Sequence, residues 1–371
     1  MDFDFLIDQF RAIGWKNIVM IVVGLILIYL AIKKKMEPSL LLPMGFGAIL
    51  VNLPLSGVLN QGETAGAIQW LYEFGIEASE IFPLLLFIGI GAMIDFSPLL
   101  SNPKLIFFGA AAQIGIFISM IIASFFFDIR DAASIGIIGA ADGPTSILVA
   151  LQLNSKFVGP ISVAAYSYMA LVPMIQPLAI KLVTTKKERK IRMNYNPKSV
   201  SKTAKILFPI VVTLIAGLIA PKSISLVGFL MFGNLIKECG VLNDLSETAS
   251  KTLVNLITLL LGITIAFKMT ADEFVSVDTL IILGIGLFAF VFDTIGGVLF
   301  AKFINLFTKN KINPMVGAAG ISAFPMSARV VQKLGIEADP ENHLLMHAVS
   351  ANVAGQIASV LAGGIILGML L

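Results

Sequence analysis

The sequence is poor in the side chains that soluble and metal-dependent enzymes use most. It holds one cysteine, Cys239, and two histidines, His343 and His347, among 371 residues. One cysteine excludes an intrachain disulfide and a cysteine cluster for zinc or iron–sulfur, and two histidines argue against a histidine-rich metal site. The same shortage argues against a membrane-embedded hydrolase or protease, which needs a catalytic triad or a metal cluster.

Charge is also scarce, and this sets the class of protein. Charged residues make up 13% of the chain and apolar residues 57%, whereas soluble domains have about 25% and about 45–50%. We therefore expect an all-α polytopic membrane protein with no room for a large soluble catalytic domain. The net charge of +3 is small and the basic residues lie in loops beside apolar runs, so no nucleic-acid partner is expected.

Apolar runs of about 20 residues predict the membrane-spanning helices. They lie near 17–33, 39–59, 79–95, 103–127, 156–183, 203–220, 223–237, 250–267, 277–305 and 343–370. Two further stretches, 132–153 and 313–335, are interrupted in the middle by small residues, a proline and a charge. We expect both to be broken or re-entrant, which leaves ten crossings.

Short loops rich in lysine and arginine indicate the cytoplasmic side. Such loops are 33–35, 186–205 and 302–311, so we expect a multi-pass protein of the cell (inner) membrane with a basic cytoplasmic loop. The acidic N-terminus, with Asp2, Asp4 and Asp8, then lies outside. It has neither the basic start nor the cleavage site of a signal peptide, and we expect it to be retained.

Several words occur twice along the chain. GIGAMIDF (89–96) is echoed by GITIAFKM (262–269), and GAADGPTS (139–146) by GAAGISAFPMS (317–327). An odd number of predicted crossings separates the copies, which predicts an inverted repeat of the kind found in alternating-access transporters. Chance recurrence of small apolar words is the alternative. The expected division is a scaffold at 1–78, repeats at 79–183 and 250–371, and the basic loop with linking helices at 184–249.

Asp142 lies in the middle of the first interrupted stretch. A carboxylate at that depth is costly and is a functional candidate by default. Gly143 and Pro144 free backbone carbonyls beside it, and Thr145 and Ser146 add hydroxyl oxygens of the kind that a hard cation such as sodium prefers. The alternative is an aspartate that is merely paired with an arginine.

The second interrupted stretch and the last helix offer further oxygen ligands. Asn313, Gly317 and Ser322 supply neutral oxygens and tight backbone, and the amide of Asn352 can complete a cation shell or make one interhelical hydrogen bond. Arg329 suits a carboxylate or carbamate anion, or else extends from the membrane to the cytoplasm.

Three more side chains are candidates. Tyr166 and Tyr168 stand two residues apart and cannot share a helical face, so one can face the site while the other packs. A phenol can relay a proton or simply end in a hydrogen bond. Asp293 is a second deep carboxylate, which can join a proton path or pair with another helix.

The longest words resemble those of one family. GIGAMIDF, GAADGPTSI, AAYSYMALVPMIQP, NPMVGAAGISAFPMSARVVQ and LLMHAVSANVAGQI are similar to the β subunit of the sodium-translocating, biotin-dependent decarboxylases, and the resemblance runs over most of the chain. That family includes the oxaloacetate, methylmalonyl-CoA, glutaconyl-CoA and malonate decarboxylase pumps.

The resemblance implies a translocase subunit that works in a complex. A carboxyltransferase subunit moves a carboxyl group to biotin on a biotin carrier protein, and a small membrane-anchor subunit completes the assembly. The β subunit decarboxylates the carboxybiotin, exports Na+ and consumes an external proton. A homo-oligomer is left open.

The resemblance also implies roles for individual residues. Asp142 matches the central sodium and proton residue, and Tyr166 and Tyr168 match residues that serve the site beside it. The matches to Asn313, Gly317, Ser322 and Asn352 help bind sodium, and the match to Arg329 is tied to carboxybiotin. The main alternative is a sodium-coupled secondary transporter of an organic anion, which uses the same repeat, sodium ligands and arginine.

Overall fold

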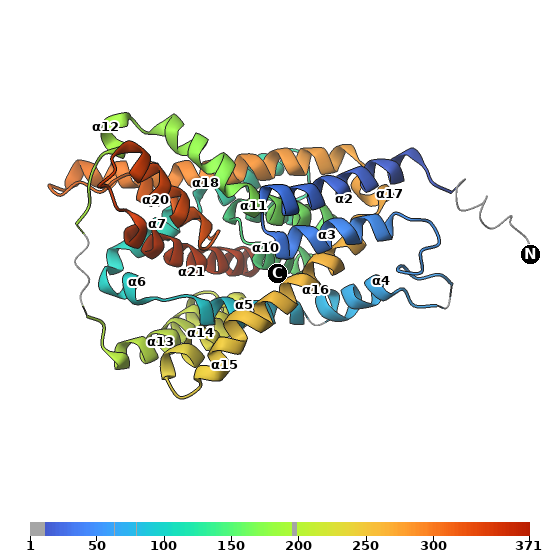
Figure 1. Ribbon diagram of the computed structural model, residues 1–371, viewed down its shortest axis with the longest axis horizontal. Coiled ribbons are helices and arrows are strands. Elements are labelled where there is room, and N and C mark those ends of the chain that lie inside the picture. The colour runs from blue at the N-terminus through green and yellow to red at the C-terminus, as the bar shows by residue number, and fades with distance from the viewer. Residues whose placement is uncertain (1–11, 63, 79, 195–198) are drawn as a thin grey trace, which may run out of the picture.

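Helices form the framework of the molecule (Figure 1). The computed structural model describes residues 12–62, 64–78, 80–194 and 199–371, and within these ranges strand pairing is limited to one isolated bridge between Gln61 and Thr64. The longer helices are α2 (Trp15–Lys34), α3 (Pro38–Val51), α5 (Ile81–Met93), α8 (Ile114–Ala123), α10 (Gly143–Gln152), α11 (Val158–Val183), α13 (Lys202–Ile219), α14 (Ile224–Cys239), α16 (Val254–Ile265), α18 (Val277–Phe307), α20 (Met326–Ala338) and α21 (Leu345–Leu370). The predicted all-α class is confirmed.

Shorter elements bend and connect these helices. They include α4 (Ala67–Tyr72), η1 (Glu73–Glu77), α6 (Ser97–Ser101), α7 (Ile106–Ala111), α9 (Ile129–Gly136), η3 (Ile137–Ala140), α12 (Lys186–Arg189), α15 (Asn243–Glu247), η5 (Thr248–Leu253), η6 (Ala266–Lys268), α17 (Ala271–Phe274) and α19 (Met315–Ala318).

Seven helical stretches within the described ranges are long and apolar enough to cross a membrane. They correspond to seven of the predicted spans, and a bent pair of helices, 67–77 and 81–93, meeting at 64°, gives an eighth. The predicted span 39–59 is wrong at its end, because α3 is 14 residues long and ends at Val51. The chain then turns through Leu55 and Gly57, both at positive φ, which interrupts the helical backbone.

Large apolar side chains cover the outside of the bundle. Leu182, Leu218 and Leu306 are 78%, 84% and 77% exposed. Water would make such a surface unstable, whereas lipid chains solvate it without cost. The protein is therefore a multi-pass membrane protein.

Both stretches predicted to be interrupted are interrupted. In the first, α9 and η3 end at Ala141, which has φ +53°, and α10 begins at Gly143. In the second, α19 ends at Ala318 and α20 begins only at Met326, after a non-helical segment. Proline at the second helical position of α10 and directly before α20 fits the start of a new helix, where no intrahelical N–H bond is lost.

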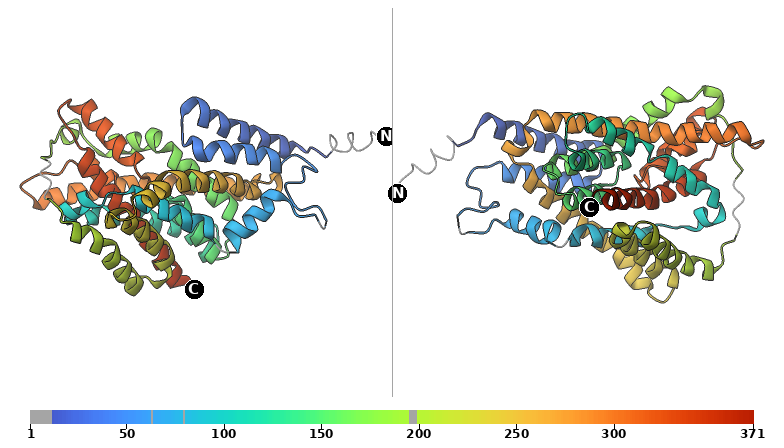
Figure 2. Two further views of the ribbon diagram at one scale, coloured as in Figure 1. Left: turned by 60° about the horizontal axis from the view of Figure 1, so that its bottom comes forward. Right: turned by 180° about the vertical axis from the view of Figure 1, so that it is seen from behind.

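Two helix pairs pack with very close backbones. A Cβ on Gly91 of α5 would lie 1.8 Å from the Leu230 carbonyl oxygen of α14, and one on Gly262 of α16 would lie 2.8 Å from that of Leu40 in α3. Only small residues permit such approach between helices in a membrane. The helices α2, α3, α13 and α14 lie on the outside of the bundle, while α10 and α21 lie in its middle (Figures 1 and 2).

Each of these pairs also carries a buried asparagine at the same kind of place. Asn234 of α14 donates its amide N–H to the Ile94 carbonyl at the end of α5, at 3.0 Å. Asn52, directly after α3, donates to the Met269 carbonyl that follows η6, at 2.8 Å. Both bonds cap a helix end whose last carbonyls have no partner within the helix.

Candidate functional site

The two interruptions touch each other in the middle of the bundle. The Ser322 hydroxyl donates to the Ala140 carbonyl at 2.5 Å, and the Ser322 N–H donates to the same oxygen at 3.2 Å. Ser322 is buried. The predicted correspondence of the two stretches thus becomes a direct contact between their non-helical backbones.

Asp142 lies at this contact, at the N-terminus of α10. Its Oδ2 accepts hydrogen bonds from the Thr145 hydroxyl at 2.8 Å and from the Ser359 hydroxyl of α21 at 3.0 Å. The Ser146 hydroxyl donates to the Asp142 carbonyl at 2.8 Å. Within the described residues no arginine or lysine forms an ion pair with Asp142, so the alternative of a simple Asp–Arg pair finds no support.

A cavity of about 290 Å³ opens beside Asp142. Tyr166, Ser322 and Gln356 line it together with the aspartate, and Glu37 lines it from the connection between α2 and α3. The Tyr166 hydroxyl is buried and has no hydrogen-bond partner within the described residues. A carboxylate, hydroxyls and a phenol therefore share one enclosed space, in which a small cation or a proton can be exchanged.

Gly143 fixes the distance between the aspartate and the tyrosine. A Cβ at this position would lie 2.2 Å from the ring of Tyr166. The ring therefore packs flat on the backbone of the residue that follows Asp142, which only glycine permits.

Three side chains on one face of α21 reach the interruptions. Asn352 donates to the Ile321 carbonyl at 2.6 Å, Gln356 donates to the Ser322 carbonyl, and Ser359 donates to Asp142. Their spacing of four and three residues places them on one helical face. The interhelical hydrogen bond expected of Asn352 exists, and its partner is the second interruption.

Tyr168 lies apart from this cavity. Its hydroxyl donates to the Leu283 carbonyl of α18, and its ring packs near Gly286 and Ile138. One tyrosine of the pair thus faces the site while the other packs between helices, as the helical period requires.

Gly317 also lies apart from the cavity. A Cβ on it would lie 2.0 Å from the Gly297 carbonyl oxygen, so it permits α19 to pack directly on α18.

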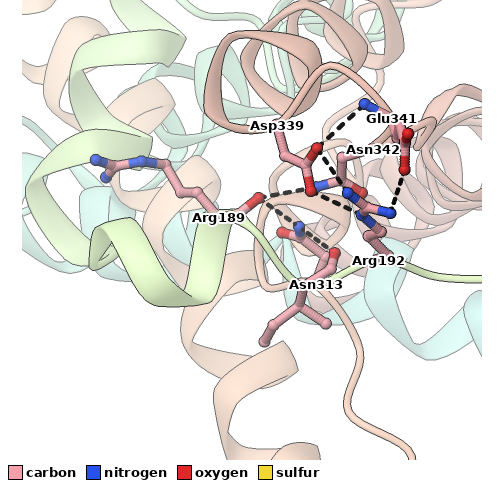
Figure 3. A network of polar contacts seen from close by, with 7 residues as sticks. Arg189, Arg192, Asn313, Asp339, Glu341 and Asn342 are labelled. Atoms are coloured by element: carbon pink, nitrogen blue, oxygen red, sulfur yellow. Dashed lines mark hydrogen bonds and ion pairs between the residues drawn. The ribbon is translucent and has the colours of Figure 1, made fainter.

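Asn313 belongs to a polar network at one end of the molecule (Figure 3). Its amide donates to the carbonyls of Arg189 and Ile191 at 3.0 and 2.8 Å, and Asn342 donates to the same Arg189 carbonyl at 2.9 Å. Arg192 forms a two-pronged ion pair with Asp339 at 2.7 and 3.0 Å and also contacts Glu341. The network ties the basic loop after α11 to the loops that flank α20.

We expect Arg192→Ala to loosen this loop. The hydrogen bonds from Arg192 hold the pKa of Asp339 below its ordinary value, so their stabilisation is present above the unfolded pKa and is lost as pH falls through the lowered value. The unfolding midpoint of the variant should be lower than that of the wild type at pH 7, and the two should converge in acid. A difference that persists below the lowered pKa would assign the effect to packing instead.

Arg329 lies on the exposed face of α20, in a second hollow of about 500 Å³ with Lys181, Lys333 and Glu337. It acts on the first cavity through charge. Burial raises the pKa of Glu37, and the positive charge of Arg329 opposes that rise. The two hollows are therefore electrostatically linked through Glu37, although Arg329 itself does not line the cavity of Asp142.

Asp293 of α18 pairs with another helix. Its Oδ1 accepts from the N–H of Gly115 at 2.5 Å, in the first turn of α8. A carboxylate fits the free amides at a helix N-terminus. Asp293 thus caps α8, and of its two open roles the structure favours the interhelical one.

Sequence reasoning missed Ser359, Gln356 and Glu37. For the first two a signal existed, since they follow Asn352 on the same helical face within a polar run of an otherwise apolar helix. For Glu37 none existed, because a loop carboxylate beside three lysines is an ordinary sight in a membrane protein.

The comparisons with known proteins match this chain over nearly its whole length. Residues 16–370 match the family model described as the Na+-transporting oxaloacetate decarboxylase beta subunit. The methylmalonyl-CoA decarboxylase subunit beta of Propionigenium modestum is 47% identical and the glutaconyl-CoA decarboxylase subunit beta of Acidaminococcus fermentans 48%, each covering 97% of this chain and 96% and 95% of the relative. The oxaloacetate decarboxylase beta chain of Klebsiella pneumoniae is 43% identical, covering 96% of this chain and 95% of the relative. The chain belongs to the family of membrane beta subunits of the sodium-pumping decarboxylases, which are subunits of translocase enzyme complexes.

Proposed function

We propose that this subunit decarboxylates carboxybiotin and uses that reaction to export Na+ through the cavity of Asp142. The observation that carries the proposal is the meeting of both interruptions at one buried carboxylate, which hydroxyl groups alone bind. A carboxylate in neutral, oxygen-rich surroundings can hold either a proton or a monovalent cation, and only one of them at a time.

The sodium ligands would come from both interruptions. Asp142, Ser146 and Ser322 supply oxygens at the contact, and Asn352 binds the adjacent backbone. Asn313 and Gly317, which the family resemblance also implicates, would act on the second interruption through its ends, where Asn313 anchors the loop and Gly317 sets the packing of α19.

The chemistry requires a proton. When the N–CO₂⁻ bond of carboxybiotin breaks, carbon dioxide leaves and the ureido nitrogen keeps the electron pair, so that nitrogen must be protonated. Tyr166 and Asp142 share the cavity and are the proton-carrying groups nearest to the exchange, with Tyr168 supporting the helix from its other side. Protonation of Asp142 expels sodium, and its deprotonation readmits it, which couples the ion to the reaction.

Arg329 would bind the carboxybiotin anion. A guanidinium pairs with a planar carboxylate or carbamate through two parallel hydrogen bonds. Its hollow is open and is lined by further lysines, which suits an anion delivered on a carrier protein. We propose a biotin carrier protein, a carboxyltransferase and a small membrane-anchor subunit as partners, with the basic loop on the cytoplasmic side of the cell membrane.

Transport would proceed by alternating access between two inverted repeats. The helix pair α2 and α3 resembles the pair α13 and α14, and the inner helix of each packs on the first helix of the other half. The caps from Asn52 and Asn234 occupy matching places. We therefore infer repeats that begin earlier than expected, covering 15–183 and 202–370, each with five crossings and one interruption.

The test is a flux assay with the purified protein in proteoliposomes. We expect decarboxylation of free carboxybiotin that depends on Na+ and is accompanied by Na+ movement, with Arg329→Gln lowering kcat/KM for carboxybiotin at least about tenfold. Sodium-driven uptake of an organic anion, with carboxybiotin left intact, would replace the proposal by the secondary-transporter alternative.

A further inference from the structure

Four side-chain amides from three parts of the fold converge on the second interruption. Each donates an N–H to a different carbonyl of residues 318–322. Gln176 of α11 binds Ala318 at 2.8 Å, Gln113 before α8 reaches Gly320 at 3.4 Å, Asn352 binds Ile321 at 2.6 Å, and Gln356 binds Ser322. We call these four residues the amide collar; all of them are buried.

The collar answers a problem that the interruption creates. Backbone carbonyls that leave a helix inside a membrane find no water and must be paired within the protein. Because a carbonyl can only accept, the orientation of each amide follows, with its nitrogen toward the backbone. The segment 318–322 is thus held by removable side-chain donors instead of a regular helix.

The other end of these amides is unsatisfied. The side-chain oxygens of Gln113, Gln176 and Asn352 are buried and have no hydrogen-bond partner within the described residues. Buried acceptors without donors are costly. Three of them around one run of exposed carbonyls form the all-oxygen surroundings that hard cations prefer.

We propose that the amide collar is a sodium-binding switch at the second interruption. Without sodium, the amide nitrogens hold the carbonyls of 318–322; when sodium enters, the amides turn and present their oxygens to the ion beside those carbonyls. The turn is about the terminal bond of each side chain, whose torsion is broad and nearly two-fold. No bond is made or broken except hydrogen bonds and ion contacts.

The inference rests on the proposed sodium transport and deepens it. It assigns Gln113, Gln176 and Gln356 to sodium binding and gives the second interruption a cation site of its own. Ser322 connects this site to the one at Asp142, because it lies at the end of the collar segment and bonds to Ala140.

The experiment measures the thermal unfolding of the full-length subunit over a sodium titration, at constant ionic strength with choline. A ligand that binds the folded state raises the unfolding midpoint in proportion to its affinity. Gln176→Leu removes both the donor and the oxygen, whereas Gln176→Glu removes the donor and keeps an oxygen ligand. Both should unfold earlier in choline. We expect the sodium midpoint to rise about tenfold or more in Gln176→Leu and to stay within about threefold of wild type in Gln176→Glu.

Asn234→Leu is the matched control. Asn234 also donates to the carbonyls of a helix end and also has a buried, unpartnered oxygen, but it lies away from the interruption. Its loss should lower stability equally in sodium and choline and leave the sodium midpoint unchanged. Gln113→Leu repeats the comparison should the Gln176 variants fail to accumulate.

The outcomes separate the inference from the function on which it rests. Equal sodium midpoints in wild type, Gln176→Leu and Gln176→Glu would overturn the switch and leave the collar as a structural clamp. Failure of the proposed function would instead appear in wild type, as decarboxylation that does not respond to sodium in proteoliposomes.

Discussion

Asp142→Asn should abolish sodium-dependent decarboxylation, with a loss of about 10²-fold to 10⁴-fold in rate, the range expected when an acid–base group is removed. Asparagine fills the same space and still accepts a hydrogen bond from Thr145 or Ser359, so the interruption should keep its shape. What it loses is the negative charge that holds either sodium or a proton. The measurement is the rate of carboxybiotin decarboxylation against sodium concentration, with sodium flux recorded in parallel.

Asp131→Asn is the control for this result. Asp131 is a buried carboxylate in the same interrupted stretch, and it accepts a serine hydroxyl, that of Ser155, at 2.7 Å. It lies at the loop end of α9, away from the cavity, and its replacement should leave sodium-dependent turnover within a few-fold of wild type. Full sodium-coupled turnover in Asp142→Asn would remove this residue from the mechanism.

Gly317→Ala should cause the largest loss of stability of any single methyl group added at the site. The new Cβ would lie 2.0 Å from the Gly297 carbonyl oxygen, and the partner glycine would meet Gly317 in the same way at 2.1 Å. Neither contact involves a flexible side chain that can move aside. Overpacking of this kind costs about 1–3 kcal/mol or more, so we expect a sharply lower unfolding midpoint and little folded protein.

Gly284→Ala is the matched variant, since it adds the same methyl group to the same helix, α18. Nothing lies within 4 Å of a Cβ at Gly284. Alanine is the better helix former, so stability should be unchanged or rise by up to about 1 kcal/mol. A sodium midpoint that shifts in Gly317→Ala while stability is retained would instead make this residue a ligand position.

Much of the candidate site could be predicted from local patterns. Asp142 stands out because a carboxylate inside an apolar stretch is costly wherever that stretch folds. The breaks at 141–143 and 319–325 could be predicted because glycine and proline disrupt helices irrespective of tertiary context. The family, too, follows from the sequence, because its long motifs are contiguous in the chain.

The sequence could not predict which of these residues meet. Tyr166 and Tyr168 look equivalent in the sequence, yet one lines the cavity and the other binds Leu283, a difference that depends on how α11 is rotated against its neighbours. Asn313 and Gly317 belong to the right stretch, but their contacts lie at its ends. Ser359 joins Asp142 across 217 positions of the chain, a distance that no local pattern spans.

The sequence alone determined that this protein is a membrane-embedded helical bundle with two broken segments and one central carboxylate, because burial of apolar surface and the cost of a charge in lipid are properties of each segment by itself. Only the tertiary structure decided that the breaks touch, that four amides hold the carbonyls of the second one, and that Glu37 links the two hollows. Those features arise from packing between segments far apart in the chain, where the partner of each freed backbone group is chosen by geometry and not by its neighbours in sequence.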